Sequence, residues 1–460
     1  MDAYKKWWEE RRDALMHDYF SLLSIPSVST DHSCAQGVMD CAEWVAAYLE
    51  GLGLHVEKWE TEGFPIIFFE KKGLCGGPKI FLYGHYDVQP ASVMEGWSSG
   101  DPFCPIEKNG RVYARGAEDN KGQIFYTFCA IRAFVEKYQG NAPVTIKGII
   151  EGEEEIGSPS LPRALSAHKE KLQADHIFFV DMGMDSLEAP VISLGCKGIM
   201  TMEVVCKNAD IDVHSGSYGG IVYNPIRALV EVLSKIVDKN GKITIPGFYE
   251  DVISVSEKER QQLHINEVVL MNKMRQLKGI RCFHKETGYE IPEVNFFRPL
   301  FEINGISGGY VGQGFKTVIP KQALVKFSYR LVPYQDFQKI FQKTKSFFQK
   351  NLPREMHLSF FLHGGGEAMW ASLSSKTIRI TRKAYEEIFG SCKVRYSGGS
   401  IPISRILVKS IDAPFAYVGT ALEEDNIHAP DENFGIDQIV SGFLLMLKIF
   451  ELCSHQKGEI

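Results

Sequence analysis

Long hydrophobic runs, a strong net charge and paired cysteines are all missing from this sequence. No run approaches the roughly eighteen consecutive apolar residues of a membrane-spanning helix. The net charge is only −6, from 51 basic and 57 acidic residues, which does not indicate a nucleic-acid-binding surface. The ten cysteines include no C-x-x-C pair, so we expect neither a disulfide framework nor a zinc knuckle. The amphipathic N-terminal stretch MDAYKKWWEERRDALMHDYFSLL also lacks the apolar core of a signal peptide. We therefore expect a cytoplasmic protein that binds neither membranes nor nucleic acid.

What is present is the composition of an ordinary globular protein, with 44% hydrophobic and 12% aromatic residues. At 460 residues, the chain is long enough for more than one domain. In residues 1–195, helical patterns alternate with short apolar runs that end in polar residues, as in parallel sheets. These runs are KIFLYGHYD (79–87), VTIKGIIEG (144–152) and HIFFVDMG (176–183). The sequence predicts an α/β domain with a mostly parallel mixed sheet flanked by helices.

The pattern changes after residue 195. The next segments read in the order strand, helix, strand, strand, helix, strand, which is typical of a small two-layer α+β domain. We predict that residues 196–366 form such an inserted domain. Residues 367–460 return to the opening pattern and are predicted to be the second part of the first domain.

Side chains that can bind metals stand at the ends of the predicted strands. His85 and Asp87 lie at i and i+2, so they share a face and the carboxylate can orient the imidazole. Asp119 precedes a helix, Asp181 follows a strand, and His428 lies in a loop after a later strand. Each of them taken alone is more often a cap, a surface charge or a structural residue. Because sites in open α/β sheets gather beyond the carboxyl ends of the strands, we expect them to converge.

The stretch EGEEEIGS (151–158) supplies further carboxylates. One glutamate of the 153–154 pair would complete five ligands, together with two histidines and two aspartates. Imidazole and carboxylate ligands together suit zinc or manganese and are too rich in nitrogen for calcium. Five ligands suit two ions about 3.5–4 Å apart if one carboxylate bridges them. The other glutamate of the pair could then accept a proton from water, and Glu151 and Glu155 are interpreted as supporting or solvated residues.

Four motifs carry a resemblance to a known family: YGHYDVQP, GRVYARGAEDNKG, EGEEEIGS and IHAPDENF. In order and spacing they resemble the co-catalytic metallopeptidase family of carnosinase, cytosolic non-specific dipeptidase, aminoacylase and succinyl-diaminopimelate desuccinylase. The resemblance covers nearly the whole chain and is strongest to the carnosinase and cytosolic dipeptidase branch. It implies a catalytic domain with an inserted lid or dimerisation domain, two divalent ions per subunit (zinc first, manganese as the alternative) and a homodimer. The implied activity is hydrolysis of dipeptides or short peptides with a free C-terminal carboxylate.

The resemblance also implies a role for each residue of the metal site. His85 and Asp181 would hold one ion, Glu154 and His428 would hold the other, and Asp119 would bridge the two. Asp87 would orient the His85 ring. Glu153 would be the general base that activates the water and later returns the proton to the leaving amine. A cis peptide bond is implied between Asp119 and Asn120.

In the inserted domain, the motifs DVHSGSYGG, GFKTVIP and FSYRLVP match the family, as does SGGSIP further on. His214 would polarise the scissile carbonyl in the site of the partner subunit, and Arg330 would bind the substrate carboxylate in a bidentate pair. Thr317 and Ser400 would assist in binding the substrate. Without the resemblance, His214 could equally be a turn residue, and Arg330 would be interpreted as a surface charge.

Two alternatives remain at this stage. An N-acyl-amino-acid amidohydrolase shares every metal residue with a dipeptidase, so the core motifs do not separate them. A non-catalytic metal-dependent binding protein is disfavoured because the base and all five ligand positions are present. The dipeptidase branch usually has a glutamate before Gly-Gly-Ser, where this chain has Ser397, which leaves the exact substrate open.

Overall fold

The computed structural model describes residues 1–253, 271, 274–275, 280–397 and 403–454. Contacts divide the chain into two compact units. Unit 1 comprises Met1–Leu194, Ala371–Arg395 and Ile406–Ile460, and unit 2 comprises Gly195–Trp370 and Tyr396–Arg405. The boundaries expected from the sequence, after residues 195 and 366, differ from these by a few residues. No pattern in the sequence indicates that the segment Tyr396–Arg405 belongs to unit 2.

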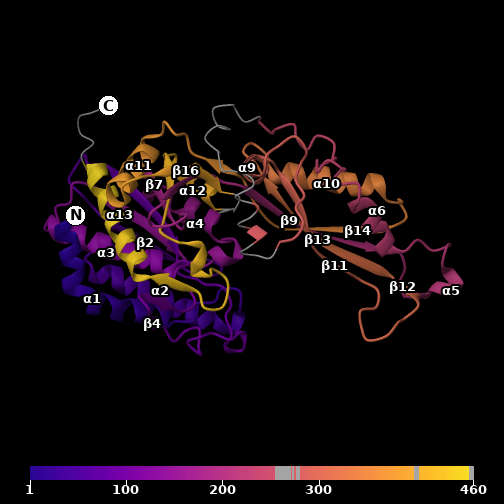
Figure 1. Ribbon diagram of the computed structural model, residues 1–460, viewed down its shortest axis with the longest axis horizontal. Coiled ribbons are helices and arrows are strands. Elements are labelled where there is room, and N and C mark those ends of the chain that lie inside the picture. The colour runs from indigo at the N-terminus through magenta and orange to yellow at the C-terminus, as the bar shows by residue number, and fades with distance from the viewer. Residues whose placement is uncertain (254–270, 272–273, 276–279, 398–402, 455–460) are drawn as a thin grey trace. The chain divides into compact units, whose positions relative to one another are not determined.

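A six-stranded mixed sheet runs through unit 1 in the order β1-β2-β6-β3-β7-β17 (Figure 1). Its strands are β1 (His55–Trp59), β2 (Ile66–Lys71), β3 (Lys79–His85), β6 (Thr145–Glu151), β7 (His176–Val180) and β17 (Phe415–Val418). Strands β6, β3, β7 and β17 are parallel, and β1 and β2 extend the sheet in antiparallel fashion. The parallel strands are almost entirely buried, which explains their near-continuous apolar sequences. The predicted fold class is confirmed.

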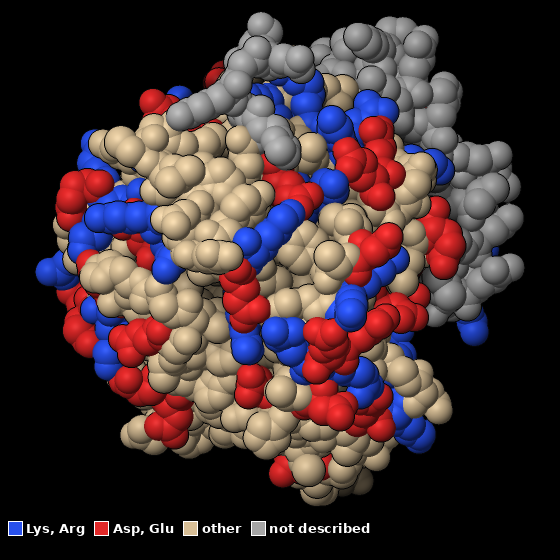
Figure 2. Space-filling view, turned by 90° about the vertical axis from the view of Figure 1, so that its left-hand side faces the viewer, with Lys and Arg blue, Asp and Glu red and all other residues tan. Residues whose placement is uncertain are grey.

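Helices of unit 1 pack around this sheet. They are α1 (Asp2–Leu23), α2 (Ala35–Gly51), α3 (Lys121–Lys137), α4 (Leu161–Ala167), α11 (Lys376–Phe389) and α13 (Ile436–Ser454), while α12 (Ser404–Ile411) begins in unit 2. Helix α1 lies against α3 and α13, with the Tyr19 and Phe125 rings stacked at 5.1 Å and the Trp8 and Phe443 rings at 5.3 Å. Among the described residues, no helix is long and apolar enough to cross a membrane. Figure 2 shows basic and acidic side chains intermixed on the face toward the viewer.

A small sheet of β4 (Ile106–Lys108), β5 (Arg111–Tyr113) and β18 (Asn433–Gly435) joins two distant parts of the sequence. Asn109 and Gly110, with φ of 53° and 72°, form the turn between β4 and β5. Strand β18 pairs with β5. The pairing places the loop that precedes β18 beside the loop that follows β5.

Unit 2 contains a four-stranded antiparallel sheet in the order β11-β13-β9-β14. Its strands are β9 (Gly198–Lys207), β11 (Leu300–Gly308), β13 (Gln322–Leu331) and β14 (His357–Gly366), with helices α6 (Pro225–Leu233) and α10 (Phe337–Asn351). Burial alternates along β9 because one face packs on the core, in which Val204, Phe327 and Phe348 are buried. The strand and helix order predicted for the inserted domain is confirmed.

The remaining elements are short. Strands β8 (Val191–Cys196), β15 (Met369–Trp370) and β16 (Lys393–Ser397) form a sheet in the order β15-β8-β16, and β10 (Val213–His214) pairs with β12 (Val318–Ile319). Two further helices are α5 (Ser215–Tyr218) and α9 (Ile291–Phe297). Single 3₁₀ turns are η1 (His32–Cys34), η2 (Val93–Glu95), η3 (Glu154–Ile156), η4 (Lys169–Lys171) and η5 (Glu423–Asp425).

Candidate metal centre

The carboxyl ends of the parallel strands in unit 1 bring candidate ligands to one edge of the sheet. Strand β3 ends at His85, which is paired with Glu151 at the end of β6. The register of β3 with β7 aligns Tyr83 with Phe179, so His85 lies level with Asp181, two residues further along each chain. Convergence at this edge follows from the parallel topology.

Asp119 presents its two carboxylate oxygens to two different histidines. Its Oδ1 lies 3.1 Å from Nε2 of His85, and its Oδ2 lies 2.9 Å from Nε2 of His428. Asp181 Oδ1 is 3.8 Å from Nε2 of His85, and Glu155 Oε1 is 3.5 Å from Nε2 of His428. The potential ligand atoms therefore form two groups, His85–Asp119–Asp181 and Asp119–Glu155–His428, that share one carboxylate.

Two buried atoms in these groups lack hydrogen bonds. Nε2 of His85 makes none, although Oδ1 of Asp119 is within 3.1 Å, and Oε1 of Glu155 makes none either. Buried polar atoms in proteins almost always have a partner. Nε2 of His85 and Oε1 of Glu155 thus face other candidate ligands without bonding to them, whereas Nε2 of His428 contacts Oδ2 of Asp119 at 2.9 Å. The donor set thus fits a divalent ion in each group, with Asp119 shared.

Asp87 orients both His85 and the acidic loop. Nδ1 of His85 lies 3.0 Å from the carbonyl oxygen of Asp87 and 3.3 Å from its Oδ1. In the neutral ring this contact places the proton on Nδ1 and leaves the lone pair of Nε2 toward Asp119 and Asp181. The Asp87 carboxylate also accepts the backbone N–H groups of Glu154 and Glu155, at 3.2 and 3.1 Å.

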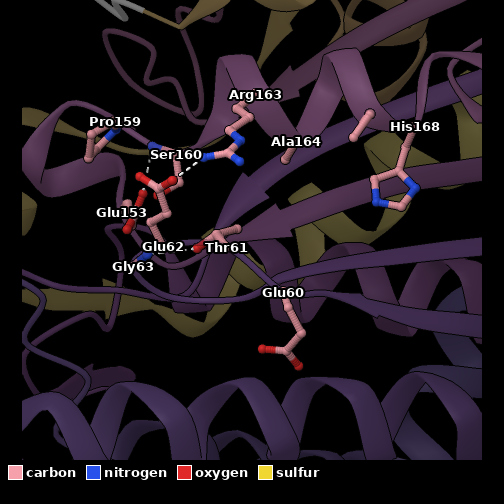
Figure 3. Close-up of a pocket in the computed structure, with 11 residues that line it drawn as sticks. Glu60, Thr61, Glu62, Gly63, Glu153, Pro159, Ser160, Arg163, Ala164 and His168 are labelled. Carbon is pink, nitrogen blue, oxygen red and sulfur yellow. Dashed lines mark hydrogen bonds and ion pairs between the residues drawn. The ribbon is translucent and has the colours of Figure 1, made fainter.

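The acidic loop differs from the sequence prediction by one position. Glu153 is 4% exposed, and its carboxylate accepts the backbone N–H groups of Phe64 and Ser160, both at 3.0 Å. It lines a separate cavity of about 460 Å³, beside the ion pair of Glu62 and Arg163 (Figure 3). The structure does not bring Glu153 to the two ligand groups.

Glu155, which the sequence prediction left as a supporting residue, occupies the position expected for Glu154 in the second ligand group. The physical cause is the 3₁₀ turn η3, which begins at Glu154 and closes at Gly157 with φ of 84°. This turn directs Glu155 toward His428 and leaves the Glu154 carboxylate near the charges of His85 and Asp181, outside both groups.

Proton affinity in the site reflects crowding of like charges. Burial raises the pKa of Glu154 well above its ordinary value, and Asp181 adds to the rise while His85 opposes it. Hydrogen bonding to Asp119 is the largest cause that raises the pKa of His428, to about 10. Burial opposes ionisation of Asp119, yet the two histidines hold the pKa of its carboxyl below the ordinary range. So dense a set of carboxylates requires bound positive charge, whether protons or metal ions.

Asn120 is a residue that the sequence analysis did not identify. The peptide bond between Asp119 and Asn120 is cis, as predicted. The Asn120 side chain donates to the carbonyl oxygen of Val180 at 2.8 Å and to Oδ1 of Asp181 at 3.0 Å. Its own oxygen accepts the backbone N–H of His85 at 3.2 Å. One amide thus ties together the ends of β3 and β7, and nothing in the residue pattern beyond its place next to Asp119 could have indicated this.

The residues predicted to bind substrate lie in unit 2. His214 and Thr317 are both exposed and adjacent, because His214 pairs with Val318 and the Ser215 N–H donates to the Thr317 carbonyl at 3.0 Å. Arg330 is half-buried on β13, and burial lowers the pKa of its guanidinium. Ser400 lies outside the described residues.

Comparison with known proteins gives a family match over most of the chain. Residues 81–452 match the profile of Peptidase family M20/M25/M40. The chain is 28% identical to the Cys-Gly metallodipeptidase of Schizosaccharomyces pombe, over 98% of this chain and 97% of that protein. It is 30% identical to the Beta-Ala-His dipeptidase of Rattus norvegicus, over 86% of this chain and 81% of that one. Among solved structures, an M20 family metallo-carboxypeptidase from Sulfolobus solfataricus matches with a TM-score of 0.85 and 29% identity, over 96% of this chain and 99% of its own.

Proposed function

Because the chain belongs to peptidase family M20/M25/M40, we propose that it is a metal-dependent dipeptidase that hydrolyses dipeptides or short peptides with a free C-terminal carboxylate. The observation that carries the proposal is the position of Asp119, whose two oxygens face two separate histidines. A carboxylate shared in this way is the feature that a dinuclear hydrolase requires. The dipeptidase names of the two relatives favour peptide hydrolysis over deacylation.

The metal ligands we propose are His85 and Asp181 for one ion, Glu155 and His428 for the other, and Asp119 for both. Imidazole nitrogen and carboxylate oxygen suit zinc first and manganese as the alternative. Bound ions of this kind supply Lewis-acid chemistry that lowers the pKa of water and polarises a carbonyl. Asp87 fixes the ring of His85 and the backbone of the acidic loop.

We assign the general base to Glu154 in place of Glu153. Both oxygens of Glu153 are engaged by backbone N–H groups beside a different cavity, so its carboxylate serves to shape the loop. Glu154 lies among the charges of the ligand groups without belonging to either of them. From this position its carboxylate would take a proton from the attacking water and return it to the leaving amine.

Residues of unit 2 would complete substrate recognition. Nδ1 of His214 accepts the backbone N–H groups of Gly216 and Ser217, at 3.0 and 3.3 Å, so the proton of the neutral ring is on Nε2. An exposed N–H donor on a fixed ring is what polarisation of a substrate carbonyl requires. Arg330 would bind the substrate carboxylate through two parallel hydrogen bonds, with Thr317 and Ser400 assisting.

We further propose a homodimer built through unit 2, in which His214 serves the metal centre of the other subunit. The exposure of His214 and its hydrogen-bonded tautomer support this role. A cytoplasmic location is also proposed, because all ten cysteines are free thiols, as suits a reducing compartment.

A hydrolysis panel tests the proposal. The metal-replete protein is assayed with free dipeptides and with N-acetylated amino acids, before and after removal of metal with a chelator. We expect turnover of dipeptides that is lost on chelation and restored by zinc or manganese. Turnover of acetylated amino acids without any action on dipeptides would instead establish the amidohydrolase alternative. Chelator-insensitive activity would refute the metal-dependent mechanism.

A further inference from the structure

Glu432 is a buried carboxylate whose hydrogen bonds all go to the loop that carries Asp119. Its side chain is 1% exposed. Oε1 accepts the backbone N–H groups of Glu118 and Asp119, at 3.0 and 3.1 Å. Oε2 accepts the N–H of Gly116 at 3.0 Å and Nη1 of Arg115 at 2.6 Å. Three backbone N–H groups of one short loop are thus held by one side chain.

The main chain of Glu432 belongs to the loop that carries His428, four positions earlier. It is fixed to β5 from both sides, because the Glu432 carbonyl accepts the Ala114 N–H at 3.1 Å and Asn433 pairs with Tyr113. The side chain then turns toward Asp119. Glu432 therefore connects, within one residue, the loops that supply Asp119 and His428 to the second ligand group.

We propose that Glu432 is a positioning residue that sets the separation of Asp119 and His428, and thereby the geometry in which both bind a divalent ion. The inference rests on the proposed function, because it assumes that ions bind to these residues. The separation it sets is the 2.9 Å between Asp119 Oδ2 and His428 Nε2.

Only an ionised carboxylate can make this set of contacts. Each of the two oxygens accepts hydrogen bonds from two donors. In a glutamine, an NH₂ group would replace one of these oxygens and would face N–H donors. The positive partner is Arg115, which is 2% exposed and whose other terminal nitrogen donates to the Pro90 carbonyl at 3.2 Å. Its guanidinium lies 5.2 Å from the centre of the Trp97 ring. The ion pair is therefore fixed in place and cannot follow a displaced carboxylate.

The test measures metal binding in the Glu432→Gln variant separately from its stability. Zinc affinity is determined by competition with a chromophoric chelator, and cobalt-substituted protein gives an absorption spectrum that reports ligand geometry. We expect zinc affinity to fall by about 10- to 100-fold, as for loss of residues that support metal ligands, and the cobalt spectrum to change. Unfolding of the metal-free protein is recorded in parallel to measure the stability of each variant.

Thr377→Val is the matched control, since Thr377 is also buried and donates to the Pro414 carbonyl at 3.2 Å, away from the ligand loops. If Glu432 had only a structural role, Glu432→Gln would lower stability as Thr377→Val does. Both variants would then keep the zinc affinity and the cobalt spectrum of the wild type. We expect the control to behave in that way and Glu432→Gln not to. Wild-type zinc affinity in folded Glu432→Gln would overturn the proposal.

If Glu432→Gln does not fold, Glu432→Asp carries the test. It keeps the charge opposite Arg115 but is one methylene too short to reach all three N–H groups, so weaker zinc binding is again expected. An aspartate variant that binds zinc like the wild type, or that cannot fold, would assign Glu432 to folding alone. A wild-type protein that binds neither zinc nor manganese would refute the proposed function, whereas equal binding by wild type and variant would refute only the role of Glu432.

Discussion

The Asp87 carboxylate accepts the backbone N–H of Glu154 at 3.2 Å. The same residue contacts Nδ1 of the His85 ring, through its carbonyl oxygen at 3.0 Å. One aspartate thereby fixes a candidate metal ligand at the end of β3 and the loop that follows β6. Asp87 therefore fixes the position of the acidic loop relative to the end of β3. The same contacts set the direction in which the loop presents its glutamates.

Replacing Glu154 by glutamine tests which glutamate is the base. We expect Glu154→Gln to retain its metal and to lose about 10²- to 10⁴-fold in kcat, because an amide cannot accept the proton of water. Dipeptide turnover and metal content are measured on the same preparation. Glu153→Gln is the comparison variant: its amide would face the backbone N–H of Phe64 or Ser160, so we expect lower stability but a much smaller loss of kcat than in Glu154→Gln. The reverse ranking of the two variants would return the role of base to Glu153.

Metal content after dialysis distinguishes a shared ligand from an unshared one. Asp119→Ala should lose both ions, because each ligand group depends on one of its oxygens. Glu155→Ala should retain the ion of His85 and Asp181 and lose the other. Elemental analysis gives the stoichiometry of each variant, with Glu60→Ala, which lies at the separate cavity, as the control. Equal metal loss in the Asp119 and Glu155 variants would contradict the assignment of a single bridging carboxylate.

Much of the fold follows from the sequence because burial dictates it. Strands β3, β6 and β7 are covered on both faces, so their apolar runs are visible, and parallel pairing then fixes where their ends lie. The alternation along β9 and β13 likewise reveals a sheet with one face on a core. The convergence of His85, Asp181 and His428, which follow parallel strands, was therefore predictable from topology, whereas Asp119 comes from the loop after β5.

The finer parts of the site were not predictable, for reasons that the structure makes clear. Three consecutive glutamates are chemically identical in the sequence, and only the turn η3 decides which of them meets His428. Asn120 and Glu432 act through hydrogen bonds to backbone groups, which leave no periodic pattern. The return of residues 396–405 to unit 2 depends on tertiary packing alone.

Arg330 is expected to determine the preference for a free carboxylate. Arg330→Met should lower kcat/KM for dipeptides by roughly 10- to 150-fold, the equivalent of about 1.5–3 kcal/mol for a hydrogen bond to a charged group. Arg330→Lys should recover only part of the loss. The lysine keeps the positive charge, but its ammonium group cannot form the bidentate pair. Kinetics on free and C-terminally amidated dipeptides give the comparison, with exposed Arg354→Met as the control. If wild type and Arg330→Met discriminate equally between free and amidated substrates, the assignment of Arg330 fails.

Lys197 should make the stability of the protein depend on pH. It is 1% exposed, and its Nζ donates to the carbonyl oxygens of Val294 and Arg298 at 3.1 and 2.6 Å. Burial, reinforced by the charges of Arg330 and Arg298, lowers its pKa from 10.5 to about 7. Between these values the unfolded chain binds the extra proton, so the free energy of unfolding should rise with pH from about 7 to 10.5.

The measurement that isolates this effect is denaturant unfolding of the wild type and Lys197→Met at several pH values within that window. The free energy of unfolding of wild type minus that of the variant should increase with pH by up to a few kcal/mol, because terms from every other titrating group cancel in the difference. Lys326→Met, which removes a lysine on β13 that is 60% exposed, should give a difference that does not change with pH. If the free energies of unfolding of wild type and Lys197→Met change with pH in the same way, Lys197 is charged in the folded protein throughout this range. Its burial would then carry no electrostatic cost.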